Sequence, residues 1–368
     1  MKFLIFNANV LTADGKVIKE GSILVKDGRI AKIGRKPASK LLCSRLIDAN
    51  GCFAAPGFID LQVYGEPEGI ACHEAMFGTT GFLATIPCTG RKETAKKVDS
   101  AVDYIRRQDG GGAKMLGINL EGPFLNRERA GAQDKKSARK PDNREIRDLV
   151  RRSKGHLKFM TVAPELKGAA DAIKILKLKG VVPSIGHTKA AFEEAENAAD
   201  LGANCATHVF NAMDEFRHRE PGAVGAILED QRISATVILD GEHISPLAFR
   251  VLLKCKGREK VILITDSLRN DSSFDAKWDG GVYRLKNGTI AGSGLTMVNA
   301  VRNAVRFGDL SVAEAVELAS GNPAKLLGLG RKGVIRAGND ADIVLFDNKF
   351  DVWLTMAEGR IVYKRCAA

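Results

Sequence analysis

The chain has 368 residues, of which 56 are Lys or Arg and 44 are Asp or Glu, giving a formal net charge of +12 at pH 7. Hydrophobic residues make up 45% of the chain and charged residues 27%, with 38 Gly and 11 Pro. This composition excludes an intrinsically disordered or collagen-like chain. The length suits one large domain with an accessory, or two medium domains.

The excess of basic residues predicts nucleic-acid binding only if those residues are concentrated in one part of the chain. They are densest within residues 127–158, but acidic residues interrupt this segment throughout. The segment also holds no aromatic residue that could stack on bases. We therefore expect a solvated surface there and no nucleic-acid partner.

Neither a membrane segment nor a disulfide framework is predicted. No apolar stretch approaches the roughly 18 residues needed to span a bilayer. Residues 1–7 become polar too early for a signal peptide. The seven cysteines are scattered and form no Cys-x-x-Cys pair, so a cysteine zinc site is not expected. The expected location is the cytoplasm, without a membrane partner.

Both ends of the chain carry short β-rich runs. The first end has them at 3–6, 10–12 and 22–33, with a hairpin signal at Asp27-Gly28. The second end has them at 342–346 and 361–363. We therefore predict a small β-sandwich domain formed by both chain termini, residues 1–55 plus 331–368. Residues 56–330 are then expected to form a separate domain.

The middle of the chain contains eight short apolar runs, separated by segments such as 189–201 and 245–256 that are typical of helices. Eight buried parallel strands, each followed by a helix, describe a (β/α)8 TIM barrel. The main alternative is a doubly wound sheet with a glycine-rich phosphate turn after its first strand, which residues 62–67 do not supply. The runs are 57–62, 81–85, 115–121, 159–163, 181–187, 205–208, 235–240 and 261–266.

Several of these runs end in a side chain capable of acid–base or metal chemistry. The carboxyl ends of barrel strands converge on one mouth, so these side chains are expected to lie together. His73 and His156 lie outside the pattern and are expected to be structural, whereas His218 in a charged run is ambiguous. The residues at the strand ends are Glu121, His187, His208, Asp240 followed by His243, and Asp266.

Two imidazoles and one carboxylate, those of His187, His208 and Glu121, are a standard ligand set for one divalent metal ion. Zinc (Zn2+) is the expected metal, and iron, cobalt and manganese suit the same ligands. A bound metal lowers the pKa of its water toward about 7. Asp266 is placed to take a proton from that water and give it to a leaving group. A single histidine at a strand end is more often structural, but the four residues together favour a metal-dependent hydrolase.

Short motifs spread over nearly the whole chain add to this interpretation. They are PGFID at 56–60, LEGPFLN at 120–126, TVAPE at 161–165, IGHT at 185–188, ATHVFNAM at 206–213, REPG at 219–222, DGEH at 240–243, TD at 265–266, GTIAGSGLTM at 288–297 and GNDADIV at 338–344. In their number and order they resemble the N-acetylglucosamine-6-phosphate deacetylase family of the amidohydrolase superfamily. The resemblance implies hydrolysis of the N-acetyl group of N-acetylglucosamine 6-phosphate to glucosamine 6-phosphate and acetate.

The resemblance also implies roles for single residues. Glu121, His187 and His208 match the metal ligands, and Asp266 matches the catalytic acid and base. Arg219 matches an arginine that binds the substrate phosphate and is often lent by the partner subunit, so a homodimer is implied. All the implied substrate contacts are Ala132, Asn211, Ala212, Arg219, His243, Ile290, Ala291 and Gly292.

The chain departs from the family pattern around the expected substrate. Gln62 and Tyr64 stand where many superfamily members carry His-x-His, which holds a second metal, so we expect one metal. Gln133 replaces the usual His, and the loops at 65–69 and 267–275 are altered. These departures leave open another N-acyl amino sugar or N-acyl compound as the substrate, or a catalytically silent binding protein.

Overall fold

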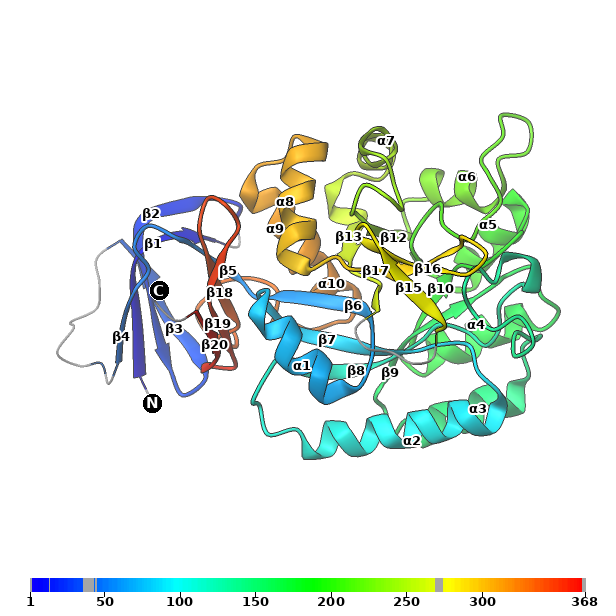
Figure 1. Ribbon diagram of the computed structural model, residues 1–368, viewed down its shortest axis with the longest axis horizontal. Coiled ribbons are helices and arrows are strands. Elements are labelled where there is room, and N and C mark those ends of the chain that lie inside the picture. The colour runs from blue at the N-terminus through cyan, green and yellow to red at the C-terminus, as the bar shows by residue number, and fades with distance from the viewer. Residues whose placement is uncertain (1, 13, 36–42, 44, 269–273, 366–368) are drawn as a thin grey trace.

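The chain forms two sheets, one built from its two ends and one from its middle (Figure 1). The computed structural model describes residues 2–12, 14–35, 43, 45–268 and 274–365. In Figure 1 the smaller sheet lies on the left with both chain ends, and the larger, helix-covered sheet lies on the right. Of the loop expected to be altered at 267–275, residues 269–273 lie outside the described residues.

All eight apolar runs of the middle segment form strands, which pair side by side in chain order. They are β6 (Phe58–Tyr64), β7 (Thr79–Ile86), β8 (Lys114–Leu120), β9 (Leu157–Val162), β10 (Val182–Ile185), β11 (Cys205–Ala206), β12 (Ser234–Ile238) and β13 (Val261–Ile264). Their side chains are almost all buried, as is typical of parallel strands covered on both faces. β14 (Ser267–Leu268) follows β13 and pairs with β6, so the barrel closes. The predicted (β/α)8 barrel is confirmed.

Ten α-helices lie among the described residues, and most of them connect successive barrel strands. They are α1 (Pro67–Met76), α2 (Arg91–Arg107), α3 (Asn143–Arg152), α4 (Ala169–Leu178), α5 (Phe192–Leu201), α6 (Gly222–Glu229), α7 (Pro246–Lys256), α8 (Met297–Gly308), α9 (Val312–Ala319) and α10 (Gly321–Leu326), with short 3-10 helices η2 (Arg127–Arg129) and η3 (Arg258–Lys260). α7 begins where its sequence predicts, because Ser245 Oγ accepts the N–H of Ala248 and Pro246 occupies the first turn. No helix within the described ranges combines the length and apolar character needed to cross a bilayer.

A hairpin extends the barrel sheet beside β14. The hairpin consists of β15 (Ala276–Asp279) and β16 (Val282–Leu285), and β17 (Ile290–Ser293) follows it and joins it to β14. β17 runs parallel to β14 and antiparallel to β16. The hairpin thereby places residues 290–293 beside the carboxyl end of β13.

The second sheet interleaves strands from the two ends of the chain. Its strands are β1 (Lys2–Leu11), β2 (Val17–Lys26), β3 (Arg29–Gly34), β4 (Arg45–Asp48), β5 (Phe53–Pro56), β18 (Ile343–Phe346), β19 (Val352–Ala357) and β20 (Arg360–Lys364). β18 pairs with β5, which joins the two ends. Along β18, Ile343 and Leu345 pack into the core of this sheet, whereas Val344 and Phe346 pack toward the barrel. A separate sheet formed by both termini is thus confirmed, and the division of the chain into domains with these bounds stays a prediction.

Phe58 holds the two sheets together. It is fully buried at the start of β6, and its ring centroid lies 6.3 Å from that of Phe346. Gly78 allows this close approach: a Cβ there would lie 2.7 Å from Val344 Cγ2 and 2.8 Å from the ring of Phe58, and its φ of +86° also favours glycine.

We expect Phe58→Ala to lower the free energy of unfolding by about 3–5 kcal/mol, because it opens a cavity between two packed layers. The matched control is Leu178→Ala, since Leu178 is 82% exposed and its truncation should change stability by no more than about 0.5 kcal/mol. Urea unfolding followed by circular dichroism measures both. Equal stability of the two variants would contradict this packing.

Lys256, at the end of α7, is a buried lysine, and no acidic side chain among the described residues pairs with it directly. It is 1% exposed, and its Nζ donates hydrogen bonds to the backbone carbonyls of Ile227, near the end of α6, and of Asp230, which follows that helix. Burial lowers its pKa to about 8, whereas an unfolded lysine titrates near about 10.4. Between these values the unfolded chain binds more protons than the folded chain, so Lys256 makes stability rise with pH in this window.

We expect Lys256→Met to abolish this contribution. The difference in the free energy of unfolding, parent minus variant, should become more positive as pH rises from 8 to 10, by at most about 1.4 kcal/mol per pH unit. Urea unfolding of both proteins at several pH values measures the difference. A difference that does not change with pH would show that Lys256 titrates as it does in the unfolded chain.

Candidate metal centre and active site

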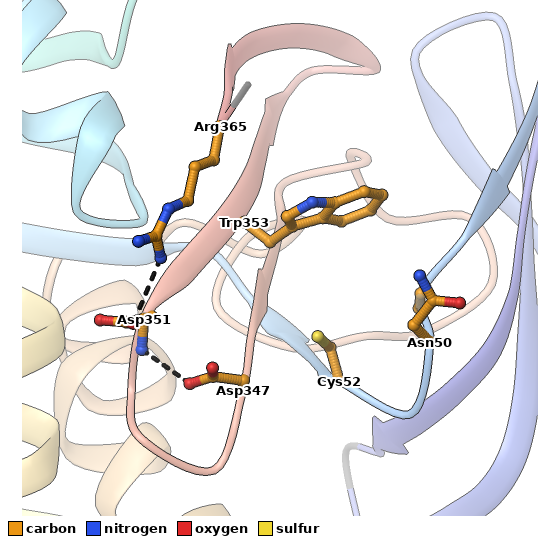
Figure 2. Close-up of a pocket in the computed structure, with 7 residues that line it drawn as sticks. Asn50, Cys52, Asp347, Asp351, Trp353 and Arg365 are labelled. Atoms are coloured by element: carbon orange, nitrogen blue, oxygen red, sulfur yellow. Dashed lines mark hydrogen bonds and ion pairs between the residues drawn. The ribbon is translucent and has the colours of Figure 1, made fainter. Parts of the chain in front are cut away.

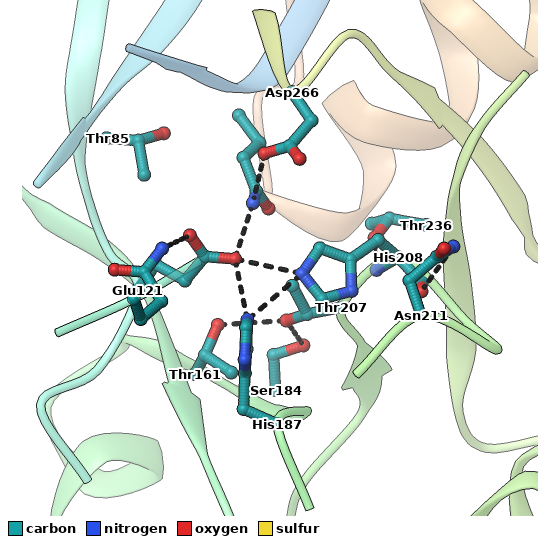
Figure 3. Close-up of polar contacts among 12 residues, drawn as sticks. Thr85, Glu121, Thr161, Ser184, His187, Thr207, His208, Asn211, Thr236 and Asp266 are labelled. Atoms are coloured by element: carbon teal, nitrogen blue, oxygen red, sulfur yellow. Dashed lines mark hydrogen bonds and ion pairs between the residues drawn. The ribbon is translucent and has the colours of Figure 1, made fainter. Parts of the chain in front are cut away.

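Four side chains expected at the barrel mouth come from the carboxyl ends of four strands (Figure 3). Glu121 directly follows β8, His187 follows β10, His208 follows β11, and Asp266 separates β13 from β14. All four are buried, with exposures between 2% and 7%. The barrel therefore brings together residues that are up to 145 positions apart in the chain (266 − 121).

Glu121, His187 and His208 form one tight cluster. Glu121 Oε1 lies 3.1 Å from His187 Nε2 and 2.9 Å from His208 Nε2, and the two Nε2 atoms are 3.2 Å apart. Among the described residues, this is the one group of three or more His, Cys, Asp or Glu side chains whose ligand atoms lie close enough together to hold a metal ion. The cluster is a candidate metal site of the kind expected from the sequence.

The hydrogen bonds around the cluster fit a cation. His187 Nδ1 lies 2.9 Å from the carbonyl oxygen of Arg129. A carbonyl only accepts, so Nδ1 carries the proton and a neutral His187 offers a lone pair at Nε2. Such a bond on the remote nitrogen is usual for metal-ligating histidines. An ionised Glu121 also only accepts, so the converging atoms are electron-pair donors that a cation would hold together.

The surroundings shift the pKa values of the two carboxyl groups of the site, Glu121 and Asp266, in opposite directions. Burial opposes ionisation of Glu121, but hydrogen bonds and charge from His187 and His208 hold its pKa at about 2. Burial also opposes the charge on His208, but Glu121 outweighs it and raises that pKa. For Asp266, burial and the negative charge of Glu121 raise the pKa to about 6. Glu121 is thus suited to be a ligand and Asp266 to be a base that works near neutral pH.

The backbone at these positions is held in an uncommon conformation. His187, His208 and Asp266 have φ values of +49°, +32° and +51°, in the left-handed region. Asp266 is fixed there because its N–H donates to Gln62 O at 2.9 Å and its carbonyl accepts the N–H of Ser293 at 3.0 Å. Left-handed backbone at residues other than glycine concentrates at functional sites.

Some of the predicted substrate contacts lie next to the cluster. Asn211 Nδ2 donates to the carbonyl of His208 at 3.3 Å, and the carbonyl of Ala212 accepts the N–H of Thr188, the neighbour of His187. His243 Nδ1 lies 2.6 Å from Asp240 Oδ2, and its charge acts on Asp266. Ala132 packs, half-buried, in the apolar cluster beside Ala291.

The other predicted contacts fall into two groups. Ile290, Ala291 and Gly292 lie on β17 beside Asp266, where a Cβ on Gly292 would come within 2.8 Å of the Asp266 carbonyl. Arg219 is exposed in segment 215–220, and no hydrogen bond or ion pair found among the described residues joins it to the cluster. Within the described residues the single chain therefore assembles the candidate metal site, while Arg219 stays exposed and makes no polar contact with that cluster.

Sequence reasoning missed the contacts of Gln62 and Gln133. Gln62 Nε2 donates to Glu121 Oε1 at 2.8 Å and to Asp266 Oδ1 at 2.7 Å. Gln133 Nε2 donates to Glu121 Oε2. In the sequence both glutamines stand out only as departures from a family pattern, and that departure is the signal that marks them as part of the site.

Two cavities that lie away from the cluster are lined by other residues. One of about 950 Å³ opens at the amino ends of β6 and β13, where Arg258 pairs with Glu314 and Glu317. That end of a barrel serves stability rather than catalysis. A cavity of about 130 Å³ lies in the terminal sheet beside Trp353 (Figure 2), where Arg365 pairs with Asp351 at 3.2 Å. It is smaller than the about 300–1,000 Å³ of small-molecule sites.

Comparison with known proteins agrees with this geometry. Residues 53–362 match the model of the Amidohydrolase family. N-acetylglucosamine-6-phosphate deacetylase from Lysinibacillus sphaericus is 34% identical over 389 residues, covering 98% of each chain. N-acetylgalactosamine-6-phosphate deacetylase from Escherichia coli O157:H7 is 31% identical over 374 residues, covering 96% of this chain and 97% of the relative.

A solved structure is similar over the same length. It is that of a mutant N-acetyl-D-glucosamine-6-phosphate deacetylase from Mycobacterium smegmatis in complex with N-acetyl-D-glucosamine-6-phosphate. The two folds match with a TM-score of 0.90 at 29% identity, covering 99% of this chain and 100% of that one. The chain therefore belongs to the amidohydrolase family and, within it, to the N-acetylglucosamine-6-phosphate deacetylases.

Proposed function

We propose that this protein hydrolyses the N-acetyl group of N-acetylglucosamine 6-phosphate, releasing acetate and glucosamine 6-phosphate. The observation that carries the proposal is the buried cluster of Glu121, His187 and His208 with Asp266 beside it. The choice of substrate rests on the relatives, because the Lysinibacillus protein is named for this sugar phosphate and the Mycobacterium structure contains it.

Glu121 Oε1, His187 Nε2 and His208 Nε2 would hold one divalent cation, and zinc is the metal that we propose. When bound, the cation acts as a Lewis acid and makes a water acidic enough to attack an amide near neutral pH. Iron, cobalt and manganese suit the same three ligands. Gln62 supports a single metal, because its NH2 group, which cannot bind a cation, lies between Glu121 and Asp266.

Asp266 is the proposed acid and base. Its carboxylate takes a proton from the attacking water as the new carbon–oxygen bond forms, and it returns that proton to the amine nitrogen as the carbon–nitrogen bond breaks. Gln62 orients Asp266 by donating to Oδ1, which leaves Oδ2 for the transfer. Asp240 orients His243, which we propose to contact the sugar.

The remaining contacts bind the sugar phosphate. We propose that the segments around Ala132, Asn211 and Ala212 border the acyl end, and that residues 290–292 close over the ring. Arg219 is the proposed phosphate ligand, because a guanidinium pairs with phosphate through two hydrogen bonds. Arg219 is exposed, and no hydrogen bond or ion pair among the described residues joins it to the cluster of its own chain, which supports a homodimer in which each subunit lends Arg219 to the other.

The test is release of acetate from N-acetylglucosamine 6-phosphate by protein of known metal content. We expect turnover by protein that holds one metal ion per chain, and a large loss of kcat/KM with unphosphorylated N-acetylglucosamine. Equal rates on the two sugars would favour an N-acyl compound without phosphate as the substrate. No turnover of either, with the metal bound, would favour a catalytically silent binding protein.

A second substrate is favoured by one comparison, the 31% identity to N-acetylgalactosamine-6-phosphate deacetylase from Escherichia coli O157:H7. The two sugars differ only in the configuration at carbon 4, so the same metal and acid–base groups serve both. The ratio of kcat/KM for the two 6-phosphates decides between them, and we propose that it favours the glucosamine derivative.

A further inference from the structure

Three residues at which the sequence departs from the family pattern, Gln62, Tyr64 and Gln133, meet around one carboxylate. Gln62 Nε2 donates to Glu121 Oε1, and Gln133 Nε2 donates to Glu121 Oε2. Gln133 Nε2 also donates to the hydroxyl of Tyr64 at 3.0 Å. These three residues therefore belong to one hydrogen-bonded group, although they lie up to 71 positions apart in the chain (133 − 62).

The orientation of the Gln133 amide is fixed from both ends. Its Oε1 accepts the backbone N–H of Cys88 at 2.8 Å, and a backbone N–H can only donate. At the other end an ionised Glu121 can only accept, so the NH2 group must face it. A flipped amide would set donor against donor at Cys88 and acceptor against acceptor at Glu121.

The surroundings exclude water from these bonds. Gln133 is 6% exposed, Tyr64 is 1% exposed and Cys88 is 2% exposed. The Tyr64 ring packs edge-on against Phe274, with 5.3 Å between ring centroids. A buried hydrogen bond to a charged group is stronger than a neutral one, and its loss leaves the charge unpaired.

Gln133 occupies one oxygen of Glu121 and leaves the other, which also accepts from Gln62, for a cation. Oε2 is taken by Gln133 and faces away from the histidines, whereas Oε1 faces both Nε2 atoms. We propose that Gln133 is a positioning residue, held by Cys88 and Tyr64, that keeps Glu121 a ligand through a single oxygen and so sets the affinity for the metal. This inference rests on the metal site of the proposed function.

The competing role for Gln133 is a direct contact with the substrate. Its three polar contacts to Cys88, Glu121 and Tyr64 already use its oxygen and both hydrogens of its nitrogen. The two roles make different predictions, because positioning of Glu121 acts on metal binding without substrate, whereas a substrate contact acts on KM alone.

The experiment measures the zinc affinity of the metal-free full-length chain by competition with a chromophoric chelator. Gln133→Met keeps the volume and removes the donors, and we expect its Kd for zinc to rise about 10–100-fold. Tyr64→Phe removes only the outer partner and should raise the Kd in the same direction, by about threefold or more. Gln231→Met, at an exposed glutamine, is the matched control and should leave the Kd unchanged.

A zinc Kd of Gln133→Met within about twofold of the parent value would overturn the inference. If Gln133→Met does not fold, as judged by far-UV circular dichroism, the Tyr64→Phe variant decides by the same criterion. A parent protein that binds no zinc or other divalent metal would instead refute the proposed function. A parent that binds one equivalent, with variants that bind as tightly, would refute only the role of Gln133.

Discussion

Replacing Asp266 by Asn is expected to lower kcat by about 10²–10⁴-fold while the protein keeps its metal. The amide oxygen of Asn can still accept the hydrogen bond from Gln62, so the geometry is preserved. The lost property is basicity, because an amide cannot take a proton from water or deliver one to the amine. Steady-state acetate release and elemental analysis of the same preparation measure the two quantities.

Asp240→Asn is the matched control for this variant. Asp240 also lies at a strand end, where it orients His243, but it does not reach the cluster. We expect a smaller loss of activity, expressed mainly in KM, because the sugar contact and not the proton transfer is disturbed. Near-parental kcat in Asp266→Asn with full metal content would remove Asp266 from the reaction.

Removing the metal is expected to abolish activity, and adding zinc should restore it. His208→Ala deletes one of three ligands, so we expect zinc content to fall well below one equivalent per chain and kcat/KM to fall at least about 100-fold. Dialysis of the parent against a strong chelator should give the same loss reversibly. Metal analysis paired with the acetate assay checks both.

His156→Ala serves as the control, since His156 lies half-buried before β9 and away from the mouth of the barrel. It should keep both metal and activity. Full activity of chelator-treated parent, shown by analysis to be free of divalent metal, would contradict a metal-dependent reaction.

The barrel could be predicted from the sequence because parallel strands buried on both faces appear as continuous apolar runs. The positions of His187, His208 and Glu121 followed from the same pattern, since the carboxyl ends of such strands meet at one mouth. The hairpin of β15 and β16 carried no such signal. β15 is largely exposed and β16 is only partly buried, so no continuous apolar run marks them.

The supporting contacts could not be predicted in the same way. Gln62, on β6, and Gln133 reach Glu121 through side-chain hydrogen bonds between segments far apart in the chain, which no periodicity encodes. Tyr64, at the end of β6, likewise meets Gln133 only through a side-chain hydrogen bond. The role expected for Arg219 rests only on a family resemblance, and in the single chain that residue is exposed.

The central claim is that Glu121, His187 and His208 hold one divalent cation. Crystals of the zinc-loaded protein, measured on both sides of the zinc absorption edge, test it most directly. We predict one anomalous peak per chain, about 2.0–2.2 Å from Glu121 Oε1 and from the Nε2 atoms of the two histidines. A zinc-loaded crystal with no peak among these three atoms, or with the peak at other residues, would contradict the account.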